Sequence, residues 1–304
     1  MDVRGCVLPQ SDLTTVRRGR RRIASIGLVL GVLALSACSA VGVNTEFSTG
    51  YLPEGVTDES KLVTDLWIGS WIAAMAVGIL VWGLTLWCMV AYRKRKDDDG
   101  SLPIQLQYNV PLEILYTVVP MLMVAGLFYY TEKAQSELHR IDPNPDLTIN
   151  VVGKQWTWDF NYVDANVHES GQMAVMTGKP GVEQTLPDLY LPVNKKVEFQ
   201  LTSRDVIHSF WVPAFLEKMD TNPGLVNKLQ VTPNKIGTYT GKCAELCGAY
   251  HSQMLFNVKV VSQEDFDAHM QKLKDEGKTG LLPNGLNRNE FVPGQDELLQ
   301  EDAR

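Results

Sequence analysis

The chain has 304 residues and a formal net charge of −7 at pH 7, with 21% charged and 45% hydrophobic residues. This length is enough for one sizeable domain with accessory segments. The acidic balance argues against a nucleic-acid-binding function, because phosphates are bound by basic patches. It is compatible with a basic protein partner.

The N-terminus has the pattern of an export signal. Five arginines between Arg17 and Arg22 precede an uncharged stretch from Ile23 to Ala37, which leads into Cys38. This pattern predicts a secretory signal over residues 1–37. The order Leu35-Ser36-Ala37-Cys38 resembles a bacterial lipobox, in which Cys38 is lipid-modified and becomes the mature N-terminus; the alternative is an ordinary signal with an incidental cysteine. Residues 1–37 carry six arginines and two aspartates, so the chain without them has a net charge of −11.

Two uncharged runs predict membrane-spanning helices. Leu66 to Tyr92 has 27 residues and Ile114 to Thr131 has 18, lengths that suit a bilayer crossing. The basic cluster from Arg93 to Lys96 between them belongs on the cytoplasmic side. We therefore expect a helical hairpin over residues 62–132 in a bacterial cell membrane. An outer segment at 38–61 would precede it and a linker at 133–146 would follow, with Cys38 and everything after the hairpin on the outer face.

After the linker, short β-like runs separated by Pro, Gly and Asn favour a β-sandwich or barrel over residues 147–262. Residues 164–190 contain several glycines and prolines and predict an inserted surface loop. Ser262-Gln263-Glu264-Asp265 resembles a capped helix start. We expect a helix over 263–275 in a C-terminal region, 263–304, that ends in a polar tail. The predicted strands are Leu147–Val152, Trp156–Tyr162, Lys196–Thr202, Leu225–Thr232, Gly237–Gly241 and Leu255–Val261.

Candidate metal ligands gather in one late segment. Cys243, Cys247, His251 and Met254 fall within twelve residues, and His208 lies upstream. Soft thiolate and thioether groups favour copper, and a Cys/His set with a weak axial Met is typical of electron-transfer copper sites. Spacing alone leaves three alternatives open. The cysteines of an exported chain can form a disulfide, the cysteines and histidines can bind zinc without Met254, or the His and Met can be ordinary packed residues.

This segment resembles subunit II of cytochrome c oxidase. The family's motif is Cys-x-Glu-x-Cys-x-x-x-His-x-x-Met with an upstream Asp-Val-x-His-Ser, and the chain matches each position. The resemblance extends to the hairpin, to Gly153-Lys154-Gln155-Trp156 and to Leu191 through Val261. It implies an α+β membrane protein in which a two-helix transmembrane hairpin is followed by a cupredoxin-like Greek-key β-barrel.

The resemblance also implies a binuclear copper A centre with two copper ions. Cys243 and Cys247 would bridge both ions, and His208 and His251 would bind one each. Met254 and the backbone carbonyl of Glu245 would be weak outer ligands.

Further roles are implied position by position. The Glu245 side chain would reach a magnesium ion shared with subunit I, and Asp220 would lie near that interface. Trp156 would receive the electron, although without the resemblance a buried strand aromatic is as good an interpretation. Glu113 would lie at the mouth of a proton channel into subunit I, although a Glu at a helix N-terminus is also a favourable dipole partner. The donor cytochrome would dock on a face that includes Trp158, Asp159 and Asp205.

The implied function is to accept electrons from a c-type cytochrome and pass them to haem in subunit I, where oxygen is reduced to water with proton pumping. One alternative is a copper-free quinol oxidase subunit II, against which the intact Cys and His set argues. Another is a membrane-tethered copper-handling protein, in which Trp156 and Glu113 would be coincidences. The 164–190 insertion and the C-terminal tail have no family counterpart, and we hypothesise that they bind a membrane-tethered cytochrome within a supercomplex, or another complex.

Overall fold

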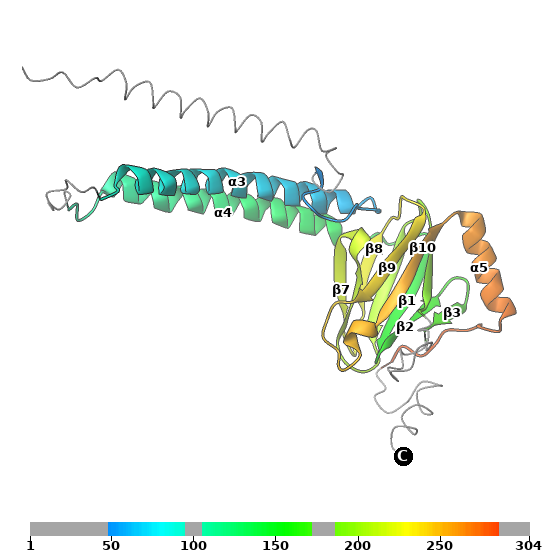
Figure 1. Cartoon of the computed structure of the whole chain (residues 1–304). Coiled ribbons are helices and arrows are strands. Elements are labelled where there is room, and N and C mark those ends of the chain that lie inside the picture. Colours follow the sequence, from blue (N-terminus) through cyan, green and yellow to red (C-terminus); the bar gives the residue numbers. More distant parts are fainter. Residues whose placement is uncertain (1–47, 95–104, 172–185, 286–304) are drawn as a thin grey trace, which may run out of the picture. The chain divides into compact units, whose positions relative to one another are not determined.

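A computed structural model describes residues 48–94, 105–171 and 186–285 (Figure 1). Several predictions fall outside these residues. They are the signal over 1–37, the lipidation site Cys38, the second half of the basic cluster (Arg95 and Lys96), residues 172–185 of the predicted loop, and the tail from residue 286 onward.

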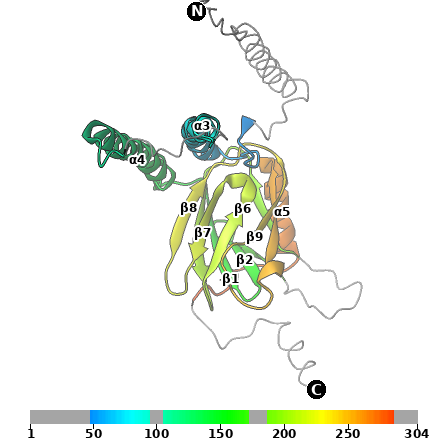
Figure 2. The ribbon, with the colours of Figure 1, turned by 60° about the vertical axis from the view of Figure 1, so that its left-hand side comes forward.

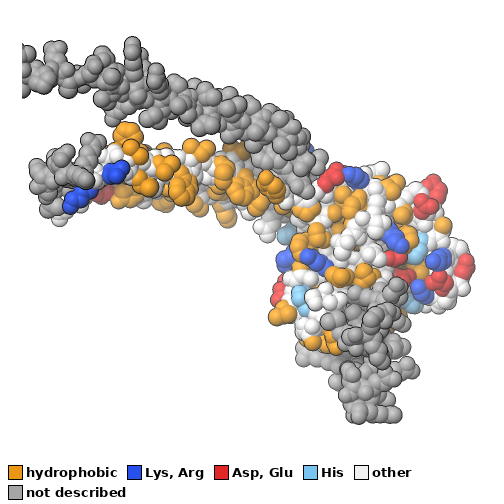
Figure 3. Space-filling view, in the orientation of Figure 1, with side chains coloured by type: hydrophobic (Ala, Val, Ile, Leu, Met, Phe, Trp, Pro, Cys, Tyr) orange, Lys and Arg blue, Asp and Glu red, His pale blue; other side chains and the backbone are white. Residues whose placement is uncertain are grey.

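Two long apolar helices form the N-terminal part of the described chain. Helix α3 spans Ser60–Ala91, helix α4 spans Val110–Leu138, and the two pack against each other. Both are long and apolar enough to cross a membrane, and their hydrophobic side chains face outward along their length (Figure 3). The two predicted spans are thereby confirmed as helices.

Helix α4 has a clear start and a later end than predicted. The Asn109 side chain accepts a hydrogen bond from the Leu112 N–H, and the Glu113 carboxylate accepts one from the Asn109 N–H at 2.9 Å. These bonds satisfy N–H groups that have no partner within the helix. Residues 133–138, predicted as linker, continue the helix, because the sequence there consists mainly of good helix formers with no proline before Pro143.

The β-domain consists of two facing five-stranded sheets (Figures 1 and 2). Most neighbours are antiparallel, but β1 pairs with β5 and β4 with β10 in parallel. This arrangement confirms the predicted fold class, a helical hairpin followed by a cupredoxin-like β-domain. The first sheet has the order β3 (Val167–Ser170), β2 (Thr157–Tyr162), β1 (Leu147–Lys154), β5 (Val197–Ser203), β8 (Asn227–Val231); the second has β4 (Asp188–Pro192), β10 (Leu255–Val261), β9 (Gly237–Cys243), β6 (His208–Val212), β7 (Glu217–Thr221).

Aromatic side chains fill the space between the sheets. Trp158 and Phe160 of β2 meet Phe256 of β10 edge to face, and Phe210 of β6 stacks on the same ring. All four side chains are almost completely buried. Each contact of this kind adds stability beyond the apolar area that it buries. Trp158 also contacts the imidazole of His208, so the aromatic core lies next to this candidate ligand.

Four strands were missed by the sequence analysis, namely β3, β4, β6 and β7. Two of them lie in the 164–190 segment, so the prediction of a surface loop is wrong for β3 and for the first residues of β4. Val167 and Leu189 are fully buried in these strands. Pairing of β3 with β2 and of β4 with β10 outweighs the turn-like composition of the segment.

Helix α5 spans Gln263–Asp275, as predicted, and packs against β3 and β4; Figure 1 shows it beside β3. The Ser262 side chain accepts a hydrogen bond from the Asp265 N–H at 3.1 Å, which caps the helix. Phe266, Met270 and Leu273 form its buried face. Two 3-10 turns complete the described elements, η1 (Pro213–Phe215) and η2 (His251–Gln253).

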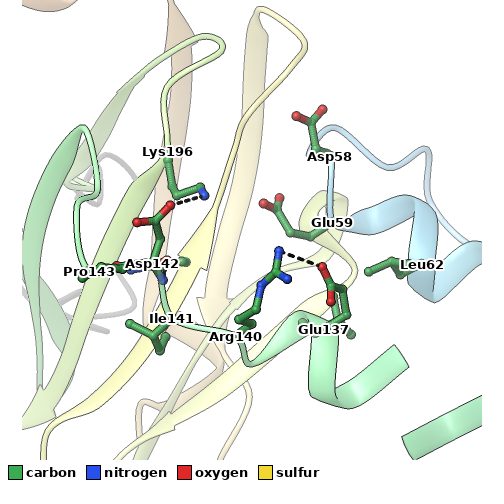
Figure 4. A pocket seen from close by; sticks show the side chains of 11 residues that line it. Asp58, Glu59, Leu62, Glu137, Arg140, Ile141, Asp142, Pro143 and Lys196 are labelled. Carbon is green, nitrogen blue, oxygen red and sulfur yellow. Dashed lines mark hydrogen bonds and ion pairs between the residues drawn. The ribbon is translucent and has the colours of Figure 1, made fainter. Parts of the chain in front are cut away.

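Hydrogen bonds tie both ends of the hairpin to the β-domain. The Glu59 carboxylate accepts bonds from the Thr232 N–H and hydroxyl at 2.9 and 3.1 Å, and Gln230 exchanges two bonds of 2.8 Å with the Asp142 backbone. A pocket of about 520 Å³ lies between these ties (Figure 4). Its basic side chains are both ion-paired, Arg140 with Glu137 and Lys196 with Asp142, so the pocket offers little to an anionic ligand.

Candidate metal centre

The candidate ligands come from two neighbouring strands and the loop that follows one of them. His208 begins β6, and Cys243 ends β9. These strands pair with Phe210 opposite Cys243, which places the imidazole of His208 beside the first thiol. The loop from β9 to β10 contains Cys247 and His251 and is closed by a hydrogen bond from the Cys243 N–H to the carbonyl of Met254 at 3.0 Å.

The side chains of this loop and His208 of β6 form a compact cluster. We call it the sulfur cluster (Cys243, Cys247, His208, His251 and Met254). The two Sγ atoms lie 3.9 Å apart. The Nδ1 of His208 lies 3.9 Å from Cys243 Sγ, and the Nδ1 of His251 lies 3.5 Å from Cys247 Sγ. The thioether of Met254 is 3.8 Å from Cys247 Sγ, and the carbonyl oxygen of Glu245 is 3.2 Å from Cys243 Sγ. Each of the two cysteine sulfurs therefore lies near the Nδ1 atom of a different histidine.

The geometry distinguishes among the interpretations that the spacing left open. Cys243 and Cys247 are free thiols, separated by about twice the length of a disulfide bond. Met254 is fully buried, and its sulfur lies 3.8 Å from Cys247 Sγ, so the thioether is close enough to act with the thiols as a candidate donor. A set of two thiols, two imidazoles and a thioether fits copper better than zinc, which favours closed Cys and His sets.

His208 is held by a carboxylate behind it. Its Nε2 lies 2.8 Å from Oδ1 of Asp205, which leaves Nδ1 directed at the sulfurs. Burial alone would lower the pKa of His208, but the bond to Asp205 and the neighbouring Cys243 outweigh burial and raise it. A carboxylate on the far nitrogen of a histidine fixes the orientation of a metal-binding imidazole.

The contact between the two thiols shifts their pKa values in opposite directions. Hydrogen bonding between Cys247 and Cys243, supported by His208, lowers the pKa of Cys243 against the effect of burial. The same contact, followed by burial, raises the pKa of Cys247. A lowered pKa favours the thiolate, which is the form of cysteine that binds metals.

Trp156 lies against the cluster at the tip of the β1–β2 hairpin. Its indole Nε1 donates a hydrogen bond to the carbonyl of Cys247 at 3.2 Å, and its half-buried ring packs edge to face on Tyr250 at a centroid distance of 4.9 Å. Trp156 therefore contacts the backbone of Cys247 while part of its ring is exposed at the protein surface.

The predicted docking face needs correction at two residues. Trp158 is completely buried among core aromatics, and Asp159 is 1% exposed and ion-paired to Lys154 at 2.7 Å. Neither side chain is accessible to a docking cytochrome, because β2 lies inside the first sheet and both of its faces are covered. Asp205 is partly buried, and its carboxylate is bonded to His208 and to the N–H of Gln155.

The remaining predicted residues lie apart from the sulfur cluster or face away from it. The side chain of Glu245 is exposed although its carbonyl faces Cys243. Asp220 lies on β7 with its carboxylate 3.3 Å from Lys218, and Glu113 lies in the first turn of α4. No role was predicted for Gln155 or Gly153, whose only signal in the sequence is their place in the Gly153-Lys154-Gln155-Trp156 motif.

Comparisons with known proteins give a consistent result. The family described as cytochrome C oxidase subunit II, periplasmic domain, matches residues 147–261. The probable cytochrome c oxidase subunit 2 of Streptomyces avermitilis is 42% identical over 306 residues, which cover 91% of this chain and 95% of that one. Cytochrome c oxidase subunit 2 of Mycobacterium tuberculosis is 37% identical over 324 residues, covering 89% and 86%. The crystal structure of the periplasmic domain of subunit II (CoxB) of Bradyrhizobium japonicum has 34% identity and a TM-score of 0.40, covering 45% of this chain and 99% of that one.

The relatives extend over nearly the whole chain, including both apolar helices. The chain is therefore a two-span membrane protein that assembles with other oxidase subunits into an oxidoreductase complex. It belongs to the cytochrome c oxidase subunit II family.

Proposed function

We propose that the sulfur cluster holds a binuclear copper A centre. The residues that would hold the copper are Cys243, Cys247, His208, His251 and Met254, together with the backbone carbonyl of Glu245. The observation that carries this proposal is the pairing of two free thiols 3.9 Å apart with one imidazole Nδ1 each, at 3.9 and 3.5 Å. Copper, when bound there, would supply one-electron redox chemistry.

The chain contributes rigidity and exclusion of water. His208 and Met254 are fully buried, and the two thiols are about 5% exposed. Trp158 packs beside His208 and donates a hydrogen bond to the Met254 carbonyl at 3.4 Å. Ligands held by packing and by hydrogen bonds keep one geometry while the charge of the site changes.

We infer that the electron donor is a c-type cytochrome that docks over Trp156 on the outer side of the membrane. With copper held by the sulfur cluster, the site would accept one electron from the donor haem, which would be oxidised. Trp156 supports this route because its half-buried ring is bonded directly to the backbone of Cys247. The electron then passes to haem in subunit I, where oxygen is reduced to water with proton pumping.

Contacts with subunit I complete the proposal. The exposed Glu245 carboxylate would bind a magnesium ion shared with subunit I, Asp220 would lie at the same interface, and Glu113 would lead protons toward a channel. Cys38 would carry a lipid anchor. The 164–190 segment and the C-terminal tail would contact a membrane-tethered cytochrome or a neighbouring complex.

The test is Cys243→Ser in the assembled oxidase, with Cys88→Ser as the matched control because Cys88 lies in α3, away from the cluster. We expect the first variant to lose copper and cytochrome c-driven oxygen consumption, while haem in subunit I is still reduced by dithionite. The control should keep both. Full cytochrome c oxidation by the Cys243→Ser variant would contradict the proposal.

A further inference from the structure

The tip of the β1–β2 hairpin is bonded to the sulfur cluster by two side chains that share one acceptor. Lys154 pairs with Thr157, so Gln155 and Trp156 form the turn between the strands. The side-chain amide of Gln155 donates to the carbonyl oxygen of Cys247 at 2.7 Å, and the indole of Trp156 donates to the same oxygen at 3.2 Å. We call this arrangement the Cys247 clamp.

The backbone of the tip is fixed at the opposite end of the cluster. The Gln155 N–H donates to Oδ2 of Asp205 at 2.7 Å, while Oδ1 of the same carboxylate lies 2.8 Å from Nε2 of His208. The side chain of Gln155 is therefore bonded to Cys247, which carries one of the thiols. Its backbone is bonded to Asp205, which supports the imidazole of His208.

The loop facing the tip is shaped for this contact. Gly248 has a φ of +128°, and a Cβ built there would lie 3.0 Å from the Trp156 ring and 3.2 Å from the Gln155 amide nitrogen. A side chain at this position would therefore displace both donors. Behind the tip, the buried ion pair between Lys154 and Asp159, at 2.7 Å, joins the two strands.

We propose that Gln155 is a positioning residue for electron transfer: its amide, together with the indole of Trp156, holds the Cys247 carbonyl and so fixes the Trp156 ring relative to the sulfur cluster. The inference rests on the proposed role of Trp156. With the indole hydrogen bond alone, the half-buried Trp156 ring could rotate together with the Cys247 carbonyl. The second hydrogen bond, from the Gln155 amide, holds that carbonyl in place and so limits the movement of the ring. Electron transfer slows when the contact between the relaying ring and the acceptor site loosens, so a displaced ring would lower the rate.

The experiment uses the assembled oxidase with four substitutions. Gln155→Met and Gln155→Glu keep the length of the side chain and remove the amide donor. Trp156→Phe tests the role of the indole itself. Gln271→Met is the matched control, because Gln271 lies on the exposed face of α5 and bonds only locally to Asp275. Flash-induced electron transfer from a reduced c-type cytochrome is measured against cytochrome concentration, which separates the first-order rate within the complex from the affinity.

We expect both Gln155 variants to lower the first-order rate severalfold with unchanged copper content, because the lost hydrogen bond goes to the Cys247 carbonyl and not to a candidate metal ligand. Gln155→Met, which adds no charge, should also keep the affinity and the optical spectrum. In the full chain without copper, labelled with fluorotryptophan, the ¹⁹F resonance assigned to Trp156 through the Trp156→Phe variant should shift or broaden in both. The control should match the parent chain in every measurement.

The other outcomes separate two failures. If Trp156→Phe slows the first-order rate but both Gln155 variants match the control, the clamp is rejected and the role of Trp156 stands. If Trp156→Phe itself has no effect, the proposed electron route fails. A change of affinity alone in Gln155→Met would make Gln155 a docking residue. Loss of copper in either Gln155 variant would make it part of the metal-binding scaffold, and either result overturns the positioning role.

Discussion

Gly153 lets the imidazole of His208 lie against the end of β1. A Cβ built at this position would lie 2.8 Å from Cδ2 and 3.1 Å from Cγ of His208, and 3.1 Å from the Thr221 hydroxyl. The first distance is shorter than real carbon contacts allow, so the imidazole would have to move. The requirement for glycine at this residue is therefore set by the metal site rather than by a turn.

We predict that Gly153→Ala lowers the free energy of unfolding by about 1–3 kcal/mol, the usual cost of overpacking a core, and also weakens copper binding. Urea unfolding of the full chain in detergent and copper titration measure the two effects. Gly285→Ala is the control, because a Cβ there meets no atom within 4 Å. Wild-type copper affinity in Gly153→Ala would show that His208 is not a ligand.

Asp205 supports His208 from behind, at 2.8 Å from Nε2. Asp205→Asn keeps the shape of the side chain and removes the charge that orients the imidazole. We expect copper affinity to fall by about 10–100-fold, as is usual when the carboxylate behind a metal-binding histidine is lost. Competition with a copper chelator measures this, with the exposed Asp267→Asn as control. Equal affinities for the two variants would contradict the role of Asp205.

The residues of the site fall into two groups: those whose role can be predicted from the neighbouring sequence, and those whose role depends on contacts made in the fold. The five donors of the cluster have distinctive chemistry and spacing, and the sequence predicted all of them to lie together. Asp205 was predicted to meet the cytochrome, yet it faces inward to His208, because only the pairing of β6 with β9 decides which side of that segment is covered. Gln155 has no chemical signal of its own, and its role follows from the path of the loop around Cys247.

Among the elements, boundaries were predicted best where local signals set them. Helix α5 spans 263–275 as expected, because Ser262 caps it and its buried residues recur at helical spacing. Strands β3, β4, β6 and β7 are only four or five residues long, and β7 reads Glu217-Lys-Met-Asp-Thr221. Such short strands exist because they pair with a neighbour, and pairing between distant segments leaves no local pattern.

Strand β7 begins with a buried acid whose ionisation opposes folding. Burial, and then the nearby Glu59, raise the pKa of Glu217 to about 7. Glu217 Oε1 lies 3.9 Å from Nε2 of His139. A carboxyl with a raised pKa in the folded state binds more protons when folded than when unfolded, so it makes stability fall as pH rises. For Glu217 this window runs from 4.5, its ordinary value, to about 7.

We predict that Glu217→Gln removes this loss and raises stability at pH 8 by up to about 3 kcal/mol, at roughly 1.4 kcal/mol for each pKa unit. Thermal unfolding of the full chain in detergent between pH 5 and pH 8 measures it, with Glu264→Gln on the exposed side of α5 as control. The prediction fails if the parent chain and Glu217→Gln lose stability equally over this range.

At the scale of the whole molecule, the net charge of the chain without residues 1–37 is −11, from a full-chain value of −7. A basic cytochrome is attracted to such a surface, and this attraction raises the association rate more than the affinity. We predict that the second-order rate of electron transfer from a basic c-type cytochrome falls as salt is added, because salt screens charges on exposed surfaces. Stopped-flow measurements over a range of ionic strength test this, and a rate independent of salt would reject charge-guided docking.

The whole-molecule plan, two apolar helices followed by a β-domain, was predictable because hydrophobic run length and strand-like alternation survive in a single sequence. The order of strands in the two sheets was not, since it depends on pairing between segments as distant in the chain as β4 and β10. The metal site depends on both kinds of information. Most of its candidate ligands lie within one short segment of the sequence, whereas the residues that support them come from distant parts of the fold.

The most direct test is the metal content of the purified full chain, kept under reducing conditions and then given copper, together with its electron paramagnetic resonance spectrum. We predict two copper ions per chain that share one unpaired electron, both lost in Cys247→Ser. A chain that stays free of copper with Cys243 and Cys247 joined in a disulfide, or that binds a single zinc ion, would contradict the account.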